Sequence, residues 1–368
     1  MANPKVAIIG AGPAGSIAAA ELAENRFEVR VFEEHKEIGK PVQCTGIVTA
    51  EIENLVKPGR FILNKIKSTK IFSPNGEHIE IVHGEPEIVL DRECFDRHLT
   101  LLAEKSGAEY SLNSRFIGFE RKGAKLKIRL KKNGKIITDE ADFLIGADGC
   151  LSAVAKSAGI FGKRKFFAGM QAVADLQNDN KVETYLIEKG FGWAVPESKR
   201  RVRIGVISGQ NPAPEFKKLL ESKLGKGYEK KIISRQAGLV PVYNPKIKSC
   251  AGNVYLAGDA ATMAKAATAG GIMQAVISGK AVAESIIHKK DYESLWRKRM
   301  GRELYLSLMI RNALDRFSKS DYEYLVGLFM KEKNRKILEN YSRESPSKIL
   351  LKLAINEPGL IRFLRYFV

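Results

Sequence analysis

The sequence predicts an α/β fold with three parts: a parallel-sheet domain, an inserted domain built on an antiparallel sheet, and a helical C-terminal region. Two glycine-rich turns lead to this prediction, GAGPAG at residues 10–15 and LAGDA at residues 256–260. Each follows a short apolar run typical of a buried strand, and a stretch rich in helix formers comes after it. Between the two turns, several strand-like segments with few helices indicate the antiparallel insertion.

The first turn is typical of a Rossmann-like dinucleotide-binding site. A predicted strand at residues 5–9 leads into the glycines, and a predicted helix covers residues 16–23. In such a turn Gly10 permits a tight reversal, Gly12 lets the backbone approach a pyrophosphate, and Gly15 lets the helix pack on the strand. The helix N-terminus donates N–H groups to the phosphates.

An acidic residue follows the next predicted strand, as this kind of site requires. Residues 29–32 alternate like a strand and are followed by Glu33. Glu33 is therefore placed to bind the adenosine ribose hydroxyls.

The second glycine turn indicates which dinucleotide is bound. A short apolar strand at residues 253–256 precedes Gly258 and Asp259, and a helix-like stretch from Gly270 to Ile287 follows. This arrangement resembles FAD-binding oxidoreductases of the glutathione reductase and hydroxylase type, in which such an aspartate holds the ribityl chain. The resemblance implies FAD as the cofactor.

The chain is strongly basic, with a formal net charge of +19 and a pI near 9.6. Three explanations remain open: a lysine-rich solvated surface, attraction to anionic lipid headgroups, and binding of nucleic acid. Because the basic residues are spread along the chain and form no tail, we do not expect a dedicated nucleic-acid module.

The positions of the cysteines and histidines indicate whether a metal site is expected and in which cell compartment the protein works. Cys44, Cys94, Cys150 and Cys250 form no CxxC pair, and the five histidines are scattered. We therefore expect no metal site and a cytoplasmic protein. The first predicted strand begins almost at Met1 and no apolar run reaches transmembrane length, so we expect neither a signal peptide nor a membrane span.

Arg92 carries a small electrostatic conflict. Residues 87–90 are strand-like, and Asp91 is a good N-cap for a helix over residues 92–105. Arg92 then lies in the first helical turn, where the helix dipole disfavours a cation. We expect an anionic neighbour, with the FAD pyrophosphate as one candidate, or else a solvent-exposed arginine.

Between this helix and the insertion, residues 110–148 alternate like strands. Asn133-Gly134 is a strong hairpin signal, so we predict a small antiparallel meander. The meander returns to a turn at Asp148-Gly149, followed by a helix from Ser152. Asp148 ranks second as a cofactor-site candidate, because such turns have structural reasons to exist.

The predicted domain division assigns residues 1–159 and 246–290 to the FAD-binding domain. Residues 160–245 form the substrate (catalytic) domain, and residues 291–368 form the C-terminal helical region. Within the insertion we expect one helix near residues 214–224 and strands at residues 166–176, 182–187, 192–196, 201–207 and 235–242.

Together these features resemble the p-hydroxybenzoate hydroxylase superfamily over about 290 residues. Within it, two segments are similar to the geranylgeranyl reductase family. KPVQCTG at residues 40–46 resembles that family's cysteine-bearing loop near the flavin, and FGWAVP at residues 191–196 resembles its YxWxFP substrate-site motif. Residues 258–272 resemble the form found in archaeal digeranylgeranylglycerophospholipid reductases.

The resemblance implies a set of site residues. Cys44 is the catalytic candidate, as a thiol that tunes or protonates near the flavin, or else it is a small packing residue. Phe191, Trp193 and Val195 lie on alternate positions of a strand and form an apolar wall for a prenyl chain, or else part of the core. The implied cofactor contacts are Gly10, Gly12, Ala14, Gly15, Glu33, Cys44, Gly46, Arg92, Ile117, Asp259, Gly271 and Ile272.

The sequence also departs from the family pattern. Phe191 replaces the usual tyrosine and Val195 the usual phenylalanine, so a hydroxyl is lost while apolar character is kept. No cysteine follows Cys250, so the disulfide between the loop cysteine and a C-terminal cysteine in some relatives has no counterpart. Flavin halogenases carry a related WxWxIP signature, but this chain has only Trp193 there.

These features lead us to expect an FAD-dependent reductase that saturates C=C bonds of geranylgeranyl chains in archaeal-type membrane lipids or their precursors. One alternative is a flavin-dependent monooxygenase or related oxidoreductase acting on a soluble aromatic substrate. A second is a flavoprotein that binds RNA or membrane. The electron donor is expected to be NAD(P)H or a ferredoxin-like protein.

The C-terminal region bears on membrane contact. Residues 349–355 and 360–367 mix apolar side chains with lysines and arginines. They either dock on a bilayer, giving peripheral contact at the inner face of the cell membrane, or pack on the domain core.

Overall fold

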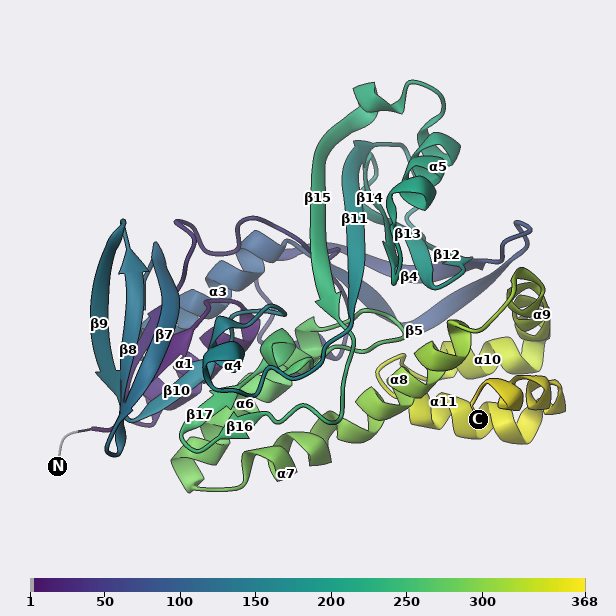
Figure 1. The fold of residues 1–368 in the computed structure, drawn as a ribbon. Helices are drawn as coiled ribbons and strands as arrows, with labels where there is room; N and C mark the ends of the chain where they lie inside the picture. The colour runs from purple at the N-terminus through teal and green to yellow at the C-terminus, as the bar shows by residue number, and fades with distance from the viewer. Residues whose placement is uncertain (1–2, 368) are drawn as a thin grey trace.

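The computed structural model describes residues 3–367 and has the expected α/β architecture (Figure 1). Its first sheet has six strands in the order β16-β17-β10-β1-β2-β6. They are β1 (Lys5–Ile9), β2 (Glu28–Phe32), β6 (Glu109–Ser111), β10 (Phe143–Gly146), β16 (Cys250–Ala251) and β17 (Val254–Leu256).

Parallel pairing brings the two glycine turns together. In the ladders β1–β10 and β10–β17, Ile9 lies opposite Gly146, and Gly146 lies opposite Leu256. The carboxyl ends of β1 and β17 therefore meet at one edge of the sheet, although the turns that follow them are far apart in sequence. In doubly wound α/β sheets this edge is where ligands bind.

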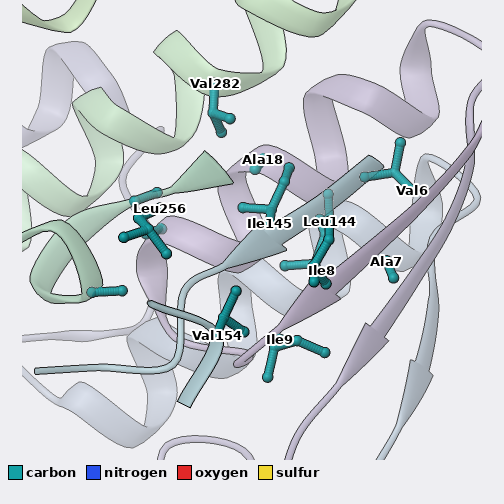
Figure 2. Close-up of a cluster of buried hydrophobic side chains, with 14 of the residues drawn as sticks. Val6, Ala7, Ile8, Ile9, Ala18, Leu144, Ile145, Val154, Leu256 and Val282 are labelled. Atoms are coloured by element: carbon teal, nitrogen blue, oxygen red, sulfur yellow. The ribbon is translucent and has the colours of Figure 1, made fainter. Parts of the chain in front are cut away.

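The core of this domain lies on both faces of the sheet (Figure 2). Ala18 of α1 (Pro13–Glu24) and Val282 of α6 (Ile272–His288) are fully buried in the same cluster as Ile8 and Ile145. Leu126, Ile128 and Leu130 of the three-stranded meander join this cluster. The meander contains β7 (Ser114–Lys122), β8 (Lys125–Lys132) and β9 (Lys135–Ala141).

The second sheet has eight strands in the order β15-β11-β14-β13-β12-β4-β5-β3. Its strands are β3 (Ile47–Thr49), β4 (Ile62–Phe72), β5 (His78–Leu90), β11 (Phe166–Asp175), β12 (Val182–Ile187), β13 (Gly190–Ser198), β14 (Arg201–Ser208) and β15 (Ile232–Pro241). Neighbours are antiparallel except β4 and β12, which pair in parallel. This sheet carries the inserted segment, with α5 (Ala213–Leu224) and η1 (Tyr228–Lys231) attached to it (Figure 1).

Three strands of this sheet come from before residue 160, so the sheet extends beyond the predicted substrate domain. The segment that follows β3 contains one short helix, α2 (Ile52–Leu55). The rest forms the long hairpin β4–β5, in which charged side chains alternate with buried Ile66, Ile79 and Ile81. Its turn contains Asn75-Gly76, where the Gly76 N–H donates to the Ser73 carbonyl over 3.0 Å.

Helices connect the sheets and complete the chain. The predicted helix α3 (Arg92–Lys105) and the short α4 (Ala153–Ser157) belong to the first domain, and η2 (Gly258–Ala261) follows β17. The helical C-terminal region is confirmed. It contains α7 (Tyr292–Trp296), a π-helical turn η3 (Arg297–Gly301), α8 (Arg302–Leu314), α9 (Lys319–Met330), α10 (Glu332–Asn340), α11 (Pro346–Asn356) and η4 (Pro358–Tyr366).

The C-terminal helices pack against the far end of the eight-stranded sheet (Figure 1). Val326 of α9 is buried against Ile79 and Ile81 of β5, with Leu338 of α10 at the edge of this cluster. Among residues 3–367, no helix has both the length and the apolar character needed to cross a bilayer.

Candidate active site

The first glycine turn leaves room for a ligand at one position and none at the other two. A Cβ on Gly10, where φ is +102°, would lie 2.3 Å from the Ala147 carbonyl oxygen, and a Cβ on Gly15 would lie 2.0 Å from that of Gly10. A Cβ on Gly12 would meet no atom within 4 Å. Gly12 is the N-cap of α1, so open space lies at a helix N-terminus, where a phosphate is stabilised.

Glu33 lies directly over this turn. Its Oε2 accepts a hydrogen bond of 2.8 Å from the Ala11 N–H, and its Oε1 lies 2.6 Å from His35 Nδ1. The carboxylate is thus fixed beside the open position at Gly12, where an adenosine ribose would follow the phosphates.

Asp259 belongs to η2 and lies beside the N-terminus of α6. Burial raises the pKa of Asp259 to about 6, and the nearby Arg92 guanidinium opposes this shift. A Cβ on Gly271, the N-cap of α6, would lie 3.1 Å from Asp259 Oδ1. The buried carboxylate can accept hydrogen bonds from ribityl hydroxyls, and the N–H groups at the start of α6 can donate to a polar ring edge, so these residues fit FAD.

Arg92 has an anionic neighbour within its own helix. Asp91 caps α3 by accepting the Cys94 N–H over 3.0 Å, and Asp96, one turn later, accepts from Arg92 Nη2 over 3.0 Å. Burial alone lowers the pKa of Arg92, but Asp96 and the Cys44 sulfur outweigh it and raise that pKa above its ordinary value. Asp96 therefore accounts for the conflict, and both Cys44 and Asp259 lie near enough to Arg92 to interact with its charge.

The loop carrying Cys44 is braced against the eight-stranded sheet. Cys44 Sγ accepts a hydrogen bond of 3.3 Å from the Gly46 N–H. The buried Arg203 of β14 donates from Nη1 to the Thr45 carbonyl and, over 3.2 Å, to the Leu90 carbonyl. Arg203 thereby fixes the loop to β5 and β14.

A cavity of about 1240 Å³ begins at this loop and extends under the sheet. Among the predicted residues that line it are Cys44, Gly46, Phe191, Trp193, Val195, Gly271 and Ile272. The cavity thus joins the expected flavin-side loop and helix N-terminus to the expected prenyl wall. The other cofactor candidates are not among its lining residues. Arg92 and Asp259 lie next to the Cys44 loop and the N-terminus of α6, Gly10, Gly12, Ala14, Gly15 and Glu33 lie at the far end of the site, and Ile117 lies on β7 with 40% of its surface exposed.

Gln171 connects the two predicted motifs and was not anticipated. Its Oε1 accepts hydrogen bonds of 2.9 Å from both Trp193 Nε1 and Thr45 Oγ1, while its Nε2 donates to Gln236 Oε1 over 2.7 Å. Gln171 is buried in β11. No local pattern marks it, because its role depends on the register of β11 and β14 and on where the Cys44 loop lies.

Two ion pairs in the cavity wall were also missed. Arg343 donates to both carboxylate oxygens of Glu87, from Nε over 2.9 Å and Nη2 over 2.6 Å. Lys265 Nζ lies 2.6 Å from Glu344 Oε1. Each pair joins the C-terminal segment to a distant part of the chain, so sequence patterns carried no signal for them.

Asp148 has a structural role. Its Oδ1 accepts from Ser152 Oγ over 2.5 Å and its Oδ2 from the Val154 N–H over 3.0 Å, which caps α4. All four cysteines are free thiols, and within residues 3–367 no group of three or more His, Cys, Asp or Glu side chains is arranged to hold a metal ion.

Comparisons with known proteins place this geometry in a family. The model of the FAD binding domain matches residues 3–288. The digeranylgeranylglycerophospholipid reductase of Methanothrix thermoacetophila is 30% identical over 87% of this chain and 90% of its own length, and that of Methanosarcina acetivorans is 31% identical over 87% of each. A geranylgeranyl bacteriochlorophyll reductase-like protein from Thermoplasma acidophilum has a similar fold, with a TM-score of 0.85, 24% identity, and coverage of 100% of this chain and 99% of its own.

The match of the FAD-binding model to most of the chain agrees with the fit of the glycine turn, Glu33 and Asp259 to that cofactor. The similarity to the two reductases extends beyond this domain, since it covers most of each chain. The protein is therefore an FAD-dependent oxidoreductase, and it belongs to the geranylgeranyl reductase family within the p-hydroxybenzoate hydroxylase superfamily.

Proposed function

We propose that this enzyme saturates C=C bonds of geranylgeranyl chains in archaeal-type membrane lipids or their precursors. The observation that carries the proposal is the single cavity joining the Cys44 loop and the N-terminus of α6 to the wall of Phe191, Trp193 and Val195. Its volume of about 1240 Å³ exceeds that of a pocket for a compact ligand and suits a long chain. Similar proteins named digeranylgeranylglycerophospholipid reductase support the same substrate class.

The chemistry requires a hydride, a proton and exclusion of water. Reduced FAD, when bound, supplies the hydride. The apolar wall holds the chain against the cofactor side of the cavity, and the Gln171 hydrogen bond fixes the orientation of the Trp193 ring. Cys44 lines the cavity, where it would contact the alkene, either guiding it or donating the proton.

The cofactor is proposed to contact the predicted residues in two groups. Gly10, Gly12, Ala14, Gly15 and Glu33 would hold the adenosine diphosphate half, and the exposed Ile117 would lie beside the adenine. Arg92, Cys44, Gly46, Asp259, Gly271 and Ile272 surround the ribityl and ring half. Electrons reach it from NAD(P)H or from a ferredoxin-like protein, and comparing FAD reduction rates with each donor distinguishes them.

Membrane contact forms part of the proposal. Leu353 and Phe363 pack into the protein, while Leu351 and Ile355 have 63% and 70% of their surface exposed. The exposed Ile361, Leu364 and Phe367 and the cations Lys348 and Lys352 extend this face. We propose that the enzyme contacts the bilayer peripherally through this face from the cytoplasmic side, where anionic headgroups attract its positive charge.

An anaerobic single turnover tests the proposed reaction. The purified FAD-loaded protein is reduced with dithionite and mixed with a geranylgeranylated glycerophospholipid in detergent. We expect the flavin to reoxidise and the lipid to gain hydrogens in pairs by mass spectrometry. A flavin that stays reduced with the lipid unchanged, yet consumes oxygen rapidly when small aromatics are added, would instead establish the monooxygenase alternative.

A further inference from the structure

The cavity contains a buried cation that the reaction described above does not use. Only 3% of the Lys265 side-chain surface is exposed, and its Nζ lies 2.6 Å from Glu344 Oε1. Lys265 comes from the loop between η2 and α6, whereas Glu344 comes from the segment between α10 and α11. Both residues line the cavity.

Local structure places Lys265 beside the expected cofactor contacts. Its N–H donates to the Gly270 carbonyl over 2.8 Å and closes the loop that ends at Gly271 and Ile272. A Cβ on Gly270 would lie 3.6 Å from Lys265 Nζ. The ammonium group is therefore next to the N-terminus of α6, on the cavity side of the residues that would face the flavin ring.

Burial of the Lys265–Glu344 ion pair costs free energy. Burying an ammonium and a carboxylate removes both from water, and this cost is offset only by good mutual geometry and added hydrogen bonds. Gln274 Nε2 lies 3.4 Å from Glu344 Oε2 and orients the carboxylate. The proposed reaction consumes one proton for each double bond, and the Lys265 ammonium is a proton source among the residues that line the cavity.

The hydrogen bonding around Cys44 makes its sulfur an acceptor. The Gly46 N–H donates to its sulfur, and the Arg92 guanidinium lies within hydrogen-bonding reach of it. Both groups are donors, so the sulfur is placed to accept hydrogen bonds. Lys265 has three N–H protons and one fixed acceptor, Glu344, which leaves protons available to the cavity.

We propose that Lys265 donates the proton to the alkene, with Glu344 as its positioning residue; this inference rests on the proposed function. One carbon of the double bond gains a hydride from the reduced cofactor, and the other gains a proton from the Lys265 ammonium. The π bond is lost, two C–H bonds form, and the cofactor is oxidised by two electrons. Lys265 is left as a neutral amine and regains a proton from water through the cavity.

The test uses the FAD-loaded protein in anaerobic single turnovers with a geranylgeranylated glycerophospholipid. We expect Lys265→Met to slow flavin reoxidation about 100-fold or more while FAD binding is kept. In the wild type the rate should fall as pH rises, because the donor must be protonated, and this limb should vanish in Lys265→Met. The charged groups that surround Lys265 are Glu344, Arg343 and Glu87. Lys230→Met, the same change at an exposed surface position, should leave the rate unaltered.

Thermal unfolding of the FAD-loaded protein separates chemistry from packing. Lys265→Met leaves Glu344 unpaired and should lower the Tm, whereas adding Glu344→Gln should restore it. The double variant should then be stable but still slow. Recovery of both Tm and rate would overturn the inference, and so would a wild-type rate in Lys265→Met. A wild-type flavin that stays reduced with the lipid would overturn the proposed function, and the inference with it.

Discussion

The edge of the six-stranded sheet and the cavity under the eight-stranded sheet are built in different ways. At the sheet edge, the ligand-facing features are backbone groups, helix N-termini and two carboxylates, and Gly12, Glu33 and Asp259 each lie within three residues of the end of a strand. The cavity is formed by side chains from the Cys44 loop, β11 and β13, the loop before α6, and the C-terminal segment. A cofactor site of the first kind depends on local geometry, whereas the substrate site depends on how distant segments are registered and docked.

Substitutions in the glycine turn at residues 10–15 should have the largest effects, on stability and on FAD binding. Gly15→Ala would bring a Cβ within 2.0 Å of the Gly10 carbonyl oxygen, so the helix and strand must separate, at a cost of at least about 3 kcal/mol. Gly12→Ala meets no atom within 4 Å and should cost less than about 1 kcal/mol, yet it should abolish FAD binding. Thermal unfolding and flavin absorbance of both variants check this. If Gly12→Ala retains FAD normally, the pyrophosphate does not pass over this position.

This difference also explains what the sequence could predict. The strand, glycine turn and helix around Gly12, the acidic Glu33 and the cap Asp91 all follow from patterns within a few residues. The hairpin β4–β5 was not predicted, although Asn75-Gly76 between its two strands is a hairpin signal. Gln171, Lys265 and Arg343 had no local signal, since each acts through a partner that only the tertiary fold brings near.

Trp193 tests whether the cavity wall acts separately from the cofactor site. Trp193→Ala removes the ring held by Gln171, and it should lower lipid reduction about 100-fold while FAD stays bound. Trp193→Phe keeps an aromatic wall but loses the N–H donor, so we expect an intermediate rate. Gln171→Leu should resemble Trp193→Phe, because it releases the ring and the Thr45 hydroxyl together. Single-turnover rates and FAD absorbance give the answer, and equal loss of FAD in all three would refute a separate substrate wall.

Asp259 should make both the stability of the protein and its affinity for FAD depend on pH. Without cofactor, its pKa is raised from 3.8 to about 6, so folding favours the protonated acid and the free energy of unfolding falls as pH rises from about 4 to 6. Ribityl hydroxyls favour the charged form, so FAD affinity should increase as pH rises through 6. Asp259→Asn should weaken FAD binding about thirtyfold and flatten that dependence. Fluorescence titrations between pH 5 and 8 measure both, and an unchanged pH profile in the variant would remove Asp259 from the cofactor site.

The smallest effect concerns the exposed face of α11. Ile355 is 70% exposed there and Ile136 is 68% exposed on β9, at the opposite end of the molecule (Figure 1). The same change to serine at each position removes similar apolar surface and should leave the free energy of unfolding within about 0.5 kcal/mol of the wild-type value. Only Ile355→Ser should weaken binding to anionic vesicles, by about fivefold, because only that side chain would enter the interface. Vesicle sedimentation at moderate salt measures the difference. Equal binding by both variants would mean that exposure alone does not make this face a membrane contact, and that the positive charge of the whole molecule accounts for any attraction to the lipid.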